Sequence, residues 1–445
     1  MCIYCLFRRL GIGSENNMVM DLIKLSAVET AAAIEAGETT CEAVTRALLE
    51  RIEEREGQVG AWEYLNPDAV LAGARELDAG PSKGLIHGVP VGVKDIIDTL
   101  EMPTTHGSPI HKKNRPCIDA PCVALVRGAG GLVLGKTVTS EFAAQHPGKT
   151  KNPHNPAHSP AGSSSGSAAA VTDFMVSVAF GTQTGGSIVR PGAFCGCIGY
   201  KPTYGDYNPL GVHDNTRSVD TLGMMSRTMA DQALMRAVLT HTPYRPIKTA
   251  TISDLRIGVC RTPNWHLADD ATQDRLMRAS RGLEAAGATV ADFALPDGYD
   301  EAMEGFDAVS GYEISRTLAY EWVNYPELLS DNMRDNRVLN GLKVTPSEYQ
   351  AGLAKLVEYR RRYAESIEGW DVLITPSAPA EAPADLSTIG EPPFNRIWTG
   401  LYGPAINLPL YAGPQGLPIG LQVIGHVGQD DRFLDAADAV YNALQ

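Results

Sequence analysis

Apolar positions along the chain either recur at helical spacing or gather into short runs. The helical spacing occurs first and predicts a helical N-terminal region. Capping-box spacings occur at Ser26–Glu29 and at Thr39–Glu42. Such a box satisfies backbone N–H groups at a helix start. The second box opens an amphipathic stretch that runs to Arg55, in which apolar residues recur at helical intervals. We therefore expect two helices before the chain changes its pattern.

From Leu85 the apolar residues gather into short runs that predict buried strands. These runs are 89–93, 132–134, 175–180, 255–260, 288–293, 371–376 and 418–424. Helices are expected between them, including 120–127, a long tract from 300 to 367 and a closing helix at 432–444. Apolar runs that alternate with helices are typical of sheets covered on both faces. We expect an α/β fold with a single large, mostly parallel mixed β-sheet core covered by helices on both faces.

The domain organisation follows from the absence of any internal repeat or long Pro- or Gly-rich linker. One catalytic unit is expected over residues 18–445, with its chemistry-bearing core at about 85–205 and a helical cover at about 300–367. Residues 1–17 differ from the rest because an apolar stretch precedes Arg8 and Arg9, which reverses the order found in a signal peptide. This leader is interpreted as a mobile tail or as an extension upstream of a start at Met18 or Met20.

The composition of the chain disfavours several kinds of binding partner. The chain is 44% hydrophobic and 20% charged, near the globular average, and its net charge of −14 disfavours nucleic acid and anionic lipid. No apolar run approaches the roughly 18 residues of a membrane span. Of the eight cysteines only Cys2 and Cys5 have metal-ligand spacing, without histidines to complete a site. We expect no metal, and reduced thiols in a cytoplasmic protein.

Candidate chemistry lies in two glycine-serine clusters, at 161–167 and 181–187, and in Lys94 upstream of them. A serine hydroxyl needs a neighbouring base to become a nucleophile, and successive glycines let backbone N–H groups turn toward an oxyanion. Lys94 ends an apolar run, where burial would lower the pKa of its ammonium group toward neutrality. The alternatives are an ion pair of Lys94 with Asp95 or Asp98, and plain glycine turns at the serine clusters.

The order lysine, serine, serine resembles the amidase signature family of serine hydrolases. Matching motifs along the chain are 135–137, 141–143, 152–153, 155–156, 190–191, 199–203, 220–221, Arg227, Asp231, 375–376 and 418–422. The resemblance implies that Lys94 is the base, that Ser163 is the bridging serine after a cis peptide bond from Gly162, and that Ser187 is the acylated nucleophile. It further implies an oxyanion hole made by the backbone amides of Thr184, Gly185, Gly186 and Ser187, with Ser164 as a supporting hydroxyl.

Arg190 resembles a position that small-acid amidases of this family use to hold a substrate carboxylate, to which a guanidinium fork is suited. The alternative is a structural ion pair beneath the loop. Tyr312, Tyr320, Trp322 and Tyr325 either line an aromatic-accepting pocket or belong to the core.

The resemblance implies a hydrolase that cleaves C–N bonds of small amides, anilides or carbamates (urethanes) through an acyl-enzyme, without a cofactor, and that pairs as a homodimer. An alternative in the family is an amidotransferase A-type glutaminase subunit, which works with a partner. Its nucleophile is usually followed by Ile-Arg-Gln-Pro, whereas Ser187 is followed by Ile-Val-Arg-Pro.

Three further interpretations belong to other classes. Residues 162–166 match the Gly-x-Ser-x-Gly nucleophile elbow, with Ser164 as nucleophile and His426 as base, but an elbow needs a strand before it and 151–160 holds three prolines. A phosphate-binding loop lacks the required Gly-Lys-Ser/Thr ending. A non-enzymatic binding subunit would have no need of the lysine and both serines.

Overall fold

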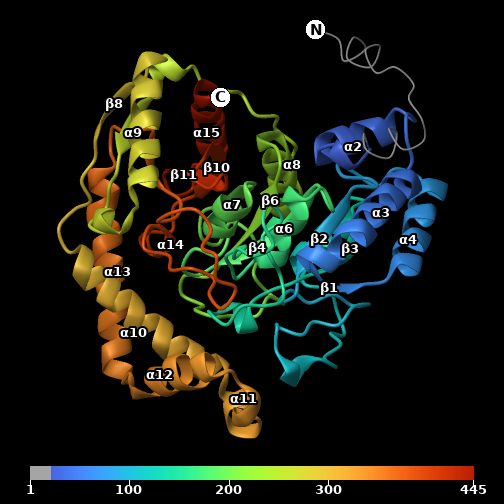
Figure 1. Cartoon of the computed structure of the whole chain (residues 1–445), viewed down its shortest axis with the longest axis horizontal. Coiled ribbons are helices and arrows are strands. Elements are labelled where there is room, and N and C mark those ends of the chain that lie inside the picture. Colours follow the sequence, from blue (N-terminus) through green and yellow to red (C-terminus); the bar gives the residue numbers. More distant parts are fainter. Residues whose placement is uncertain (1–21) are drawn as a thin grey trace.

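The computed structural model describes residues 22–445, which form an 11-stranded sheet that runs through the middle of the molecule (Figure 1). In sheet order the strands are β1 (Trp62–Leu65), β3 (Leu132–Thr137), β2 (Pro90–Lys94), β4 (Val178–Gln183), β6 (Thr221–Ser226), β5 (Ile198–Lys201), β10 (Ala405–Ala412), β11 (Pro418–Ile424), β9 (Val372–Pro376), β7 (Arg256–Val259) and β8 (Thr289–Asp292). The single sheet expected from the sequence is confirmed.

The pairing of the strands changes along the sheet. Strands β3, β2 and β4 pair in parallel, and so do β9, β7 and β8. Between these two groups, every neighbouring pair from β4 to β9 is antiparallel, and β1 is antiparallel to β3. The sheet is thus mixed, and the expectation that its strands are mostly parallel is wrong for the middle. Buried strands of either kind present the same continuous apolar runs, so the pattern could not separate them.

Helices cover both faces of the sheet. They are α2 (Ala27–Glu35), α3 (Cys41–Val59), α4 (Pro67–Ala79), α5 (Pro121–Gly128), α6 (Ser165–Thr172), α7 (Val189–Cys195), α8 (Met229–Thr240), α9 (Asp270–Ala285), α10 (Tyr299–Thr317), α11 (Ala319–Asn324), α12 (Leu339–Lys343), α13 (Pro346–Ser366), α14 (Arg396–Gly400) and α15 (Asp430–Leu444). One buried cluster joins α5, α8, α9 and α15 to the sheet, and a second joins α3, α4 and α6 to the opposite face.

The tract expected to be helical from 300 to 367 is broken into several pieces. Helices α10 and α13 pack along each other, and α11 and α12 extend from them at the lower left of Figure 1. The short segments η7 (Pro326–Leu328) and η8 (Asn332–Val338) lie between α11 and α12, and η8 is a π-helical turn. π-Helical turns occur frequently at functional sites. Segment η8 carries Arg337, which reaches the site described below.

The N-terminal helices begin close to the expected residues. Ser26 and Glu29 form the complete capping box of α2, as predicted. Helix α3 is capped one residue later than predicted, because Thr40 accepts a hydrogen bond from the Ala43 amide and no box forms between Thr39 and Glu42. The leader at 1–17 and the pair Cys2 and Cys5 lie outside the described residues.

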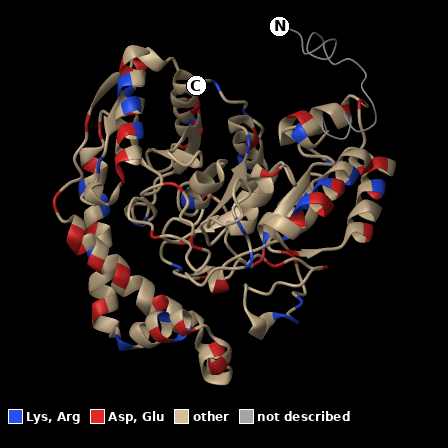
Figure 2. Cartoon of the chain, in the orientation of Figure 1, with Lys and Arg blue, Asp and Glu red and all other residues tan. Residues whose placement is uncertain are grey.

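Charged residues are distributed over the molecule rather than gathered on one element. Figure 2 shows basic and acidic residues interspersed along the same helices. Among residues 22–445, no helix combines the length and the apolar character needed to cross a bilayer.

Candidate active site

Lys94 is the last residue of β2 and is completely buried. Its Nζ atom donates hydrogen bonds to Ser163 Oγ at 2.7 Å and to Thr182 Oγ1 at 2.8 Å. Burial holds the pKa of Lys94 well below its usual value, and the Asp220 carboxylate opposes that shift. The ion pair considered for Lys94 is made instead by Lys136, whose Nζ lies 3.7 Å from Asp95 Oδ1.

The loop before α6 brings Ser163 to Lys94. The peptide bond between Gly162 and Ser163 is cis. The Gly162 carbonyl accepts a hydrogen bond from Arg190 Nη2 at 2.8 Å, and the Ser163 carbonyl accepts one from the Ser140 amide at 3.2 Å. These contacts hold both peptide groups of the loop, so the hydroxyl of Ser163 has a fixed place beside the lysine.

Ser187 lies between the end of β4 and the start of α7. Gln183 Oε1 accepts hydrogen bonds from the amides of Ile188 and Val189, and thereby caps this helix. The Ser164 amide donates to the Ser187 carbonyl at 3.4 Å, which joins the two glycine-serine clusters. Thr182 and Gln183 had no role assigned from the sequence, because a polar residue inside an apolar strand gives no pattern of its own.

The backbone near Ser187 offers free donors. Within residues 22–445, the N–H groups of Gly185, Gly186 and Ser187 donate no hydrogen bond to another protein atom, and all three residues line the same pocket. Unpaired N–H groups next to a helix N-terminus provide a favourable site for a developing negative charge. This arrangement has the form of an oxyanion hole.

Gly166, in the first turn of α6, shows why the first cluster needs glycine. A Cβ atom placed there would lie 2.2 Å from the Ala61 carbonyl oxygen and 2.3 Å from the Val138 nitrogen. Both atoms belong to the backbone and cannot turn away. We expect Gly166→Ala to lower the free energy of unfolding by roughly 1–3 kcal/mol or more, as overpacked sites do. Urea denaturation measures it, with Gly57→Ala as the control, since that glycine has nothing within 4 Å of an added Cβ.

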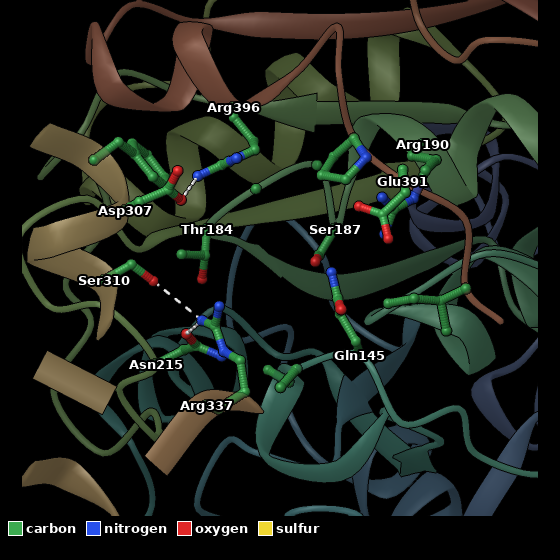
Figure 3. A pocket seen from close by; sticks show the side chains of 17 residues that line it. Gln145, Thr184, Ser187, Arg190, Asn215, Asp307, Ser310, Arg337, Glu391 and Arg396 are labelled. Carbon is green, nitrogen blue, oxygen red and sulfur yellow. Dashed lines mark hydrogen bonds and ion pairs between the residues drawn. The ribbon is translucent and has the colours of Figure 1, made fainter. Parts of the chain in front are cut away.

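The pocket beside Ser187 has a volume of about 260 Å³ and a strongly charged lining. Arg190, Arg337, Arg396, Asp307 and Glu391 all contribute to its wall (Figure 3). Arg396 forms an ion pair with Asp307. The size fits a small ligand, and the charges favour a polar one.

Arg337 lies across the pocket from Ser187 in the view of Figure 3. Its Nη2 atom donates to Ser310 Oγ at 3.1 Å and approaches Asn215 Oδ1 at 3.5 Å, and both acceptors are neutral. Its Nε atom is buried and has no hydrogen-bond partner in the described part of the chain. Among residues 22–445, no carboxylate lies within ion-pair distance of Arg337. The guanidinium therefore has an unused Nε donor and makes no direct ion pair beside the pocket, and the carboxylates of Asp307 and Asp220 act on its charge only from a longer distance.

Arg190 is only 2% exposed and also lines the pocket. Its Nη2 atom holds the Gly162 carbonyl, while Nε and Nη1 are buried without partners. Burial lowers the pKa of Arg190 to about 10, and Glu391 opposes this shift. One edge of Arg190 thus supports the loop of Ser163, and the remaining donors have no partner among the described residues.

A carboxylate lies close to the start of the loop at 184–187, which we call the oxyanion loop. Asp220 accepts a hydrogen bond from the Thr184 hydroxyl and further hydrogen bonds from the amides of Asn215 and Thr216. Burial raises the pKa of Asp220 to about 6. The sequence marked Asp220 only as part of a motif, since Thr184 is distant in sequence and the contacts with Asn215 and Thr216 depend on how the loop before Asp220 folds.

The geometry does not support two of the alternatives considered from the sequence. Ser164 does not line the pocket, and its Oγ contacts the backbone of Thr182 at 3.3 Å, while His426 bonds the Trp370 carbonyl. No strand precedes Ser164 directly in the described part of the chain, so the nucleophile elbow is not formed. None of the four aromatic residues proposed from the helical cover lines the pocket; Phe306 does.

Comparisons with known proteins show what the whole chain is similar to. The family model described as Amidase matches residues 43–434. The A-type subunit of glutamyl-tRNA(Gln) amidotransferase from Acidothermus cellulolyticus is 32% identical, and the match covers 96% of this chain and 95% of that protein. A crystal structure of an amidase has a TM-score of 0.87 with 27% identity, covering 94% of this chain and 99% of that chain. Native peptide amidase from Stenotrophomonas maltophilia has a TM-score of 0.81 with 28% identity, and the match covers 95% of this chain and 97% of that chain.

Proposed function

The chain belongs to the amidase family, whose members act on carbon–nitrogen bonds, and from this we propose that it cleaves a small amide that carries a carboxylate. The observation that carries the proposal is the unpaired guanidinium of Arg337 in the pocket of Ser187. Arg337 is partly buried, and a cation that is withdrawn from water without a direct ion pair is costly unless a ligand supplies the opposite charge. A substrate carboxylate meets this need and also directs the scissile amide toward Ser187.

The proposed reaction proceeds through an ester of Ser187. Neutral Lys94 accepts a proton from the Ser163 hydroxyl as Ser163 takes the proton of Ser187, whose oxygen attacks the amide carbon. The free amides of Gly185, Gly186 and Ser187 support the oxyanion. The same relay, reversed, protonates the leaving amine. Water then attacks the ester, and the acid and the free serine are released.

The carboxylate requirement is tested with a matched pair of substrates. Succinamate and butyramide have similar length but differ in the terminal carboxylate, and we expect kcat/KM to be higher for succinamate. Hydrogen bonds to a charged group contribute about 1.5–3 kcal/mol, which corresponds to roughly 10- to 100-fold. Arg337→Gln should remove this preference while its kcat/KM for butyramide stays within about threefold, whereas an equal loss for both substrates contradicts the proposal. Ammonia release measures all four rates.

A second candidate, a glutaminase subunit of an amidotransferase, is supported by the relatives of that name. Glutamine also carries a carboxylate and a primary amide, so the same pocket chemistry suits it. The candidates differ in the sequence that follows the nucleophile, which is Ile-Val-Arg-Pro after Ser187, and in whether a second subunit is needed for activity. We expect the isolated chain to hydrolyse succinamate; glutamine turnover that occurs only with a co-purified second subunit would favour the amidotransferase.

Anilides and aryl carbamates remain substrates to be measured beside these amides. Phe306 is the aromatic side chain of the pocket wall among the described residues, and its neighbours are charged. Removing water from charged groups without replacing their hydrogen bonds is unfavourable. We therefore expect p-nitroanilides and aryl carbamates to be turned over more slowly than succinamate, which product absorbance will determine.

A further inference from the structure

We propose that Asp220 is a positioning residue, which holds the oxyanion loop through Thr184 and connects it to the pocket wall that carries Arg337. The inference rests on the function proposed above. It goes further by assigning to Asp220 a link between the end of the pocket that would bind a carboxylate and the end where the amide would react.

The register of the sheet places Asp220 opposite Thr184. Strands β4 and β6 pair antiparallel, and their last paired residues at this end are Gln183 and Thr221. The residue after Gln183 and the residue before Thr221 therefore leave the ladder side by side. Thr184 begins the loop that runs to Ser187, so a contact at Thr184 sets where this loop starts.

Asp220 is engaged as an acceptor through both carboxylate oxygens. One oxygen accepts a hydrogen bond from the Thr184 hydroxyl. The other accepts the amide of Asn215 at 2.6 Å and that of Thr216 at 2.8 Å. Hydrogen bonds to an ionised acceptor are stronger than neutral ones. The ionised carboxylate thus ties the oxyanion loop to the segment at 215–216.

That segment is in turn connected to Arg337. The Thr216 hydroxyl lies 2.9 Å from Ser310 Oγ, which also accepts from Arg337. Asn215 lines the pocket, and its side-chain oxygen faces the same guanidinium. A carboxylate ligand that orders Arg337 would therefore act on Asn215 and Thr216, and through Asp220 on Thr184.

The charges around Asp220 come from several elements. Lys94 on β2 and Arg337 on η8 are the cations influenced by it. Asp214 on its own loop raises the pKa of Asp220, and Tyr204 after β5 has its pKa raised by Asp220. Because Asp220 favours the ammonium form of Lys94, removing its charge lowers the pKa of the proposed base.

The first test removes the link to the oxyanion loop alone. Thr184→Val keeps the shape of the side chain but loses the hydroxyl, and Thr184→Ser keeps the hydroxyl. We expect kcat for succinamate to fall roughly 10- to 100-fold in Thr184→Val, with KM changed by less than about threefold. The loss in kcat should not exceed the loss that follows deletion of a direct oxyanion donor. Thr184→Ser should recover most of the lost kcat.

A matched control exists elsewhere in the fold. Thr203 makes the same kind of hydroxyl-to-carboxylate hydrogen bond, with Asp430, and does not line the pocket. Thr203→Val should lower the melting temperature without lowering kcat. If Thr184→Val and Thr203→Val have the same effect on kcat, or if Thr184→Ser recovers nothing, the assignment to Thr184 is overturned.

The second test uses the pH profile of Asp220→Asn. In the wild-type chain kcat/KM should fall with decreasing pH as Lys94 gains its proton and as Asp220, with a pKa of about 6, loses its charge. The variant no longer titrates at residue 220, and the pKa of its Lys94 is lower. Its acid limb should therefore move to lower pH, in addition to a lower plateau. A uniformly lower rate with an unmoved acid limb indicates a structural role only and overturns the proposal.

A measurement that does not depend on substrate turnover separates this inference from the proposed function. The rate at which a fluorophosphonate modifies Ser187, followed by intact mass, also depends on the oxyanion loop. If wild-type protein is modified at Ser187 and Thr184→Val is modified equally fast, the positioning role fails while the nucleophile stands. If Ser187 is not modified at all and no amide is cleaved, the proposed function itself fails.

Discussion

Ser187→Ala is expected to abolish amide cleavage, with a loss of roughly 10⁴- to 10⁶-fold in kcat, the range found when an enzyme loses its nucleophile. Ser187 lies beside free backbone donors, in a loop that the Ser164 amide joins to the cluster of Ser163. The variant should also give no acyl adduct by intact mass when incubated with a p-nitrophenyl ester. Ser187 Oγ makes no hydrogen bond within residues 22–445, so the melting temperature should change little.

The control for this result is Ser164→Ala. Ser164 is completely buried and contacts both the amide and the carbonyl of Thr182, so its loss should weaken the support of β4 and lower kcat by about tenfold. The acyl adduct should still form. Loss of the adduct in Ser164→Ala with retention in Ser187→Ala would assign the nucleophile to Ser164 and contradict the proposed mechanism.

The residues that could be predicted from the sequence lie in compact motifs. Lys94 ends an apolar strand, and Ser163 and Ser187 lie in glycine-rich turns, so each has a local signal that the fold preserves. Arg337 has no such signal, because it lies in a helical tract rich in other charged residues. The role that we propose for it depends on how η8 packs against the pocket, where its guanidinium makes no ion pair with a carboxylate of the described residues.

The sheet was predicted in part for similar reasons. Strand β11 was predicted at its observed bounds, because Ile419, Leu421, Val423 and Ile424 give it a mainly apolar pattern. Strand β10 contains Pro409, which argues against a strand inside a sheet. The structure accommodates this proline where the register with β11 shifts between Leu408 and Tyr411. This irregularity depends on how β10 pairs with β11, which the residues of β10 alone do not show.

Lys94→Met should lower kcat by roughly 10³- to 10⁴-fold, because it removes the proposed base that starts the proton relay. Methionine fills the buried space without a charge, so the fold should persist. Burial lowers the pKa of Lys94, so in wild-type protein the unfolded chain binds more protons there than the folded chain below the usual lysine pKa. Folding is therefore disfavoured at neutral pH by this group, and Lys94→Met should melt at an equal or higher temperature.

Lys94→Arg distinguishes a base from a hydrogen-bond donor. Arginine can donate to Ser163 and Thr182 as Lys94 does, but it does not lose its proton in proteins. Both variants should therefore be inactive if Lys94 accepts a proton, whereas a donor role alone predicts activity in Lys94→Arg. The wild-type pH profile supplies the sign: activity depends on the neutral amine, so kcat/KM is full above the lowered pKa of Lys94 and is lost as the pH falls through it. Activity in Lys94→Met above a tenth of wild type would exclude Lys94 as the base.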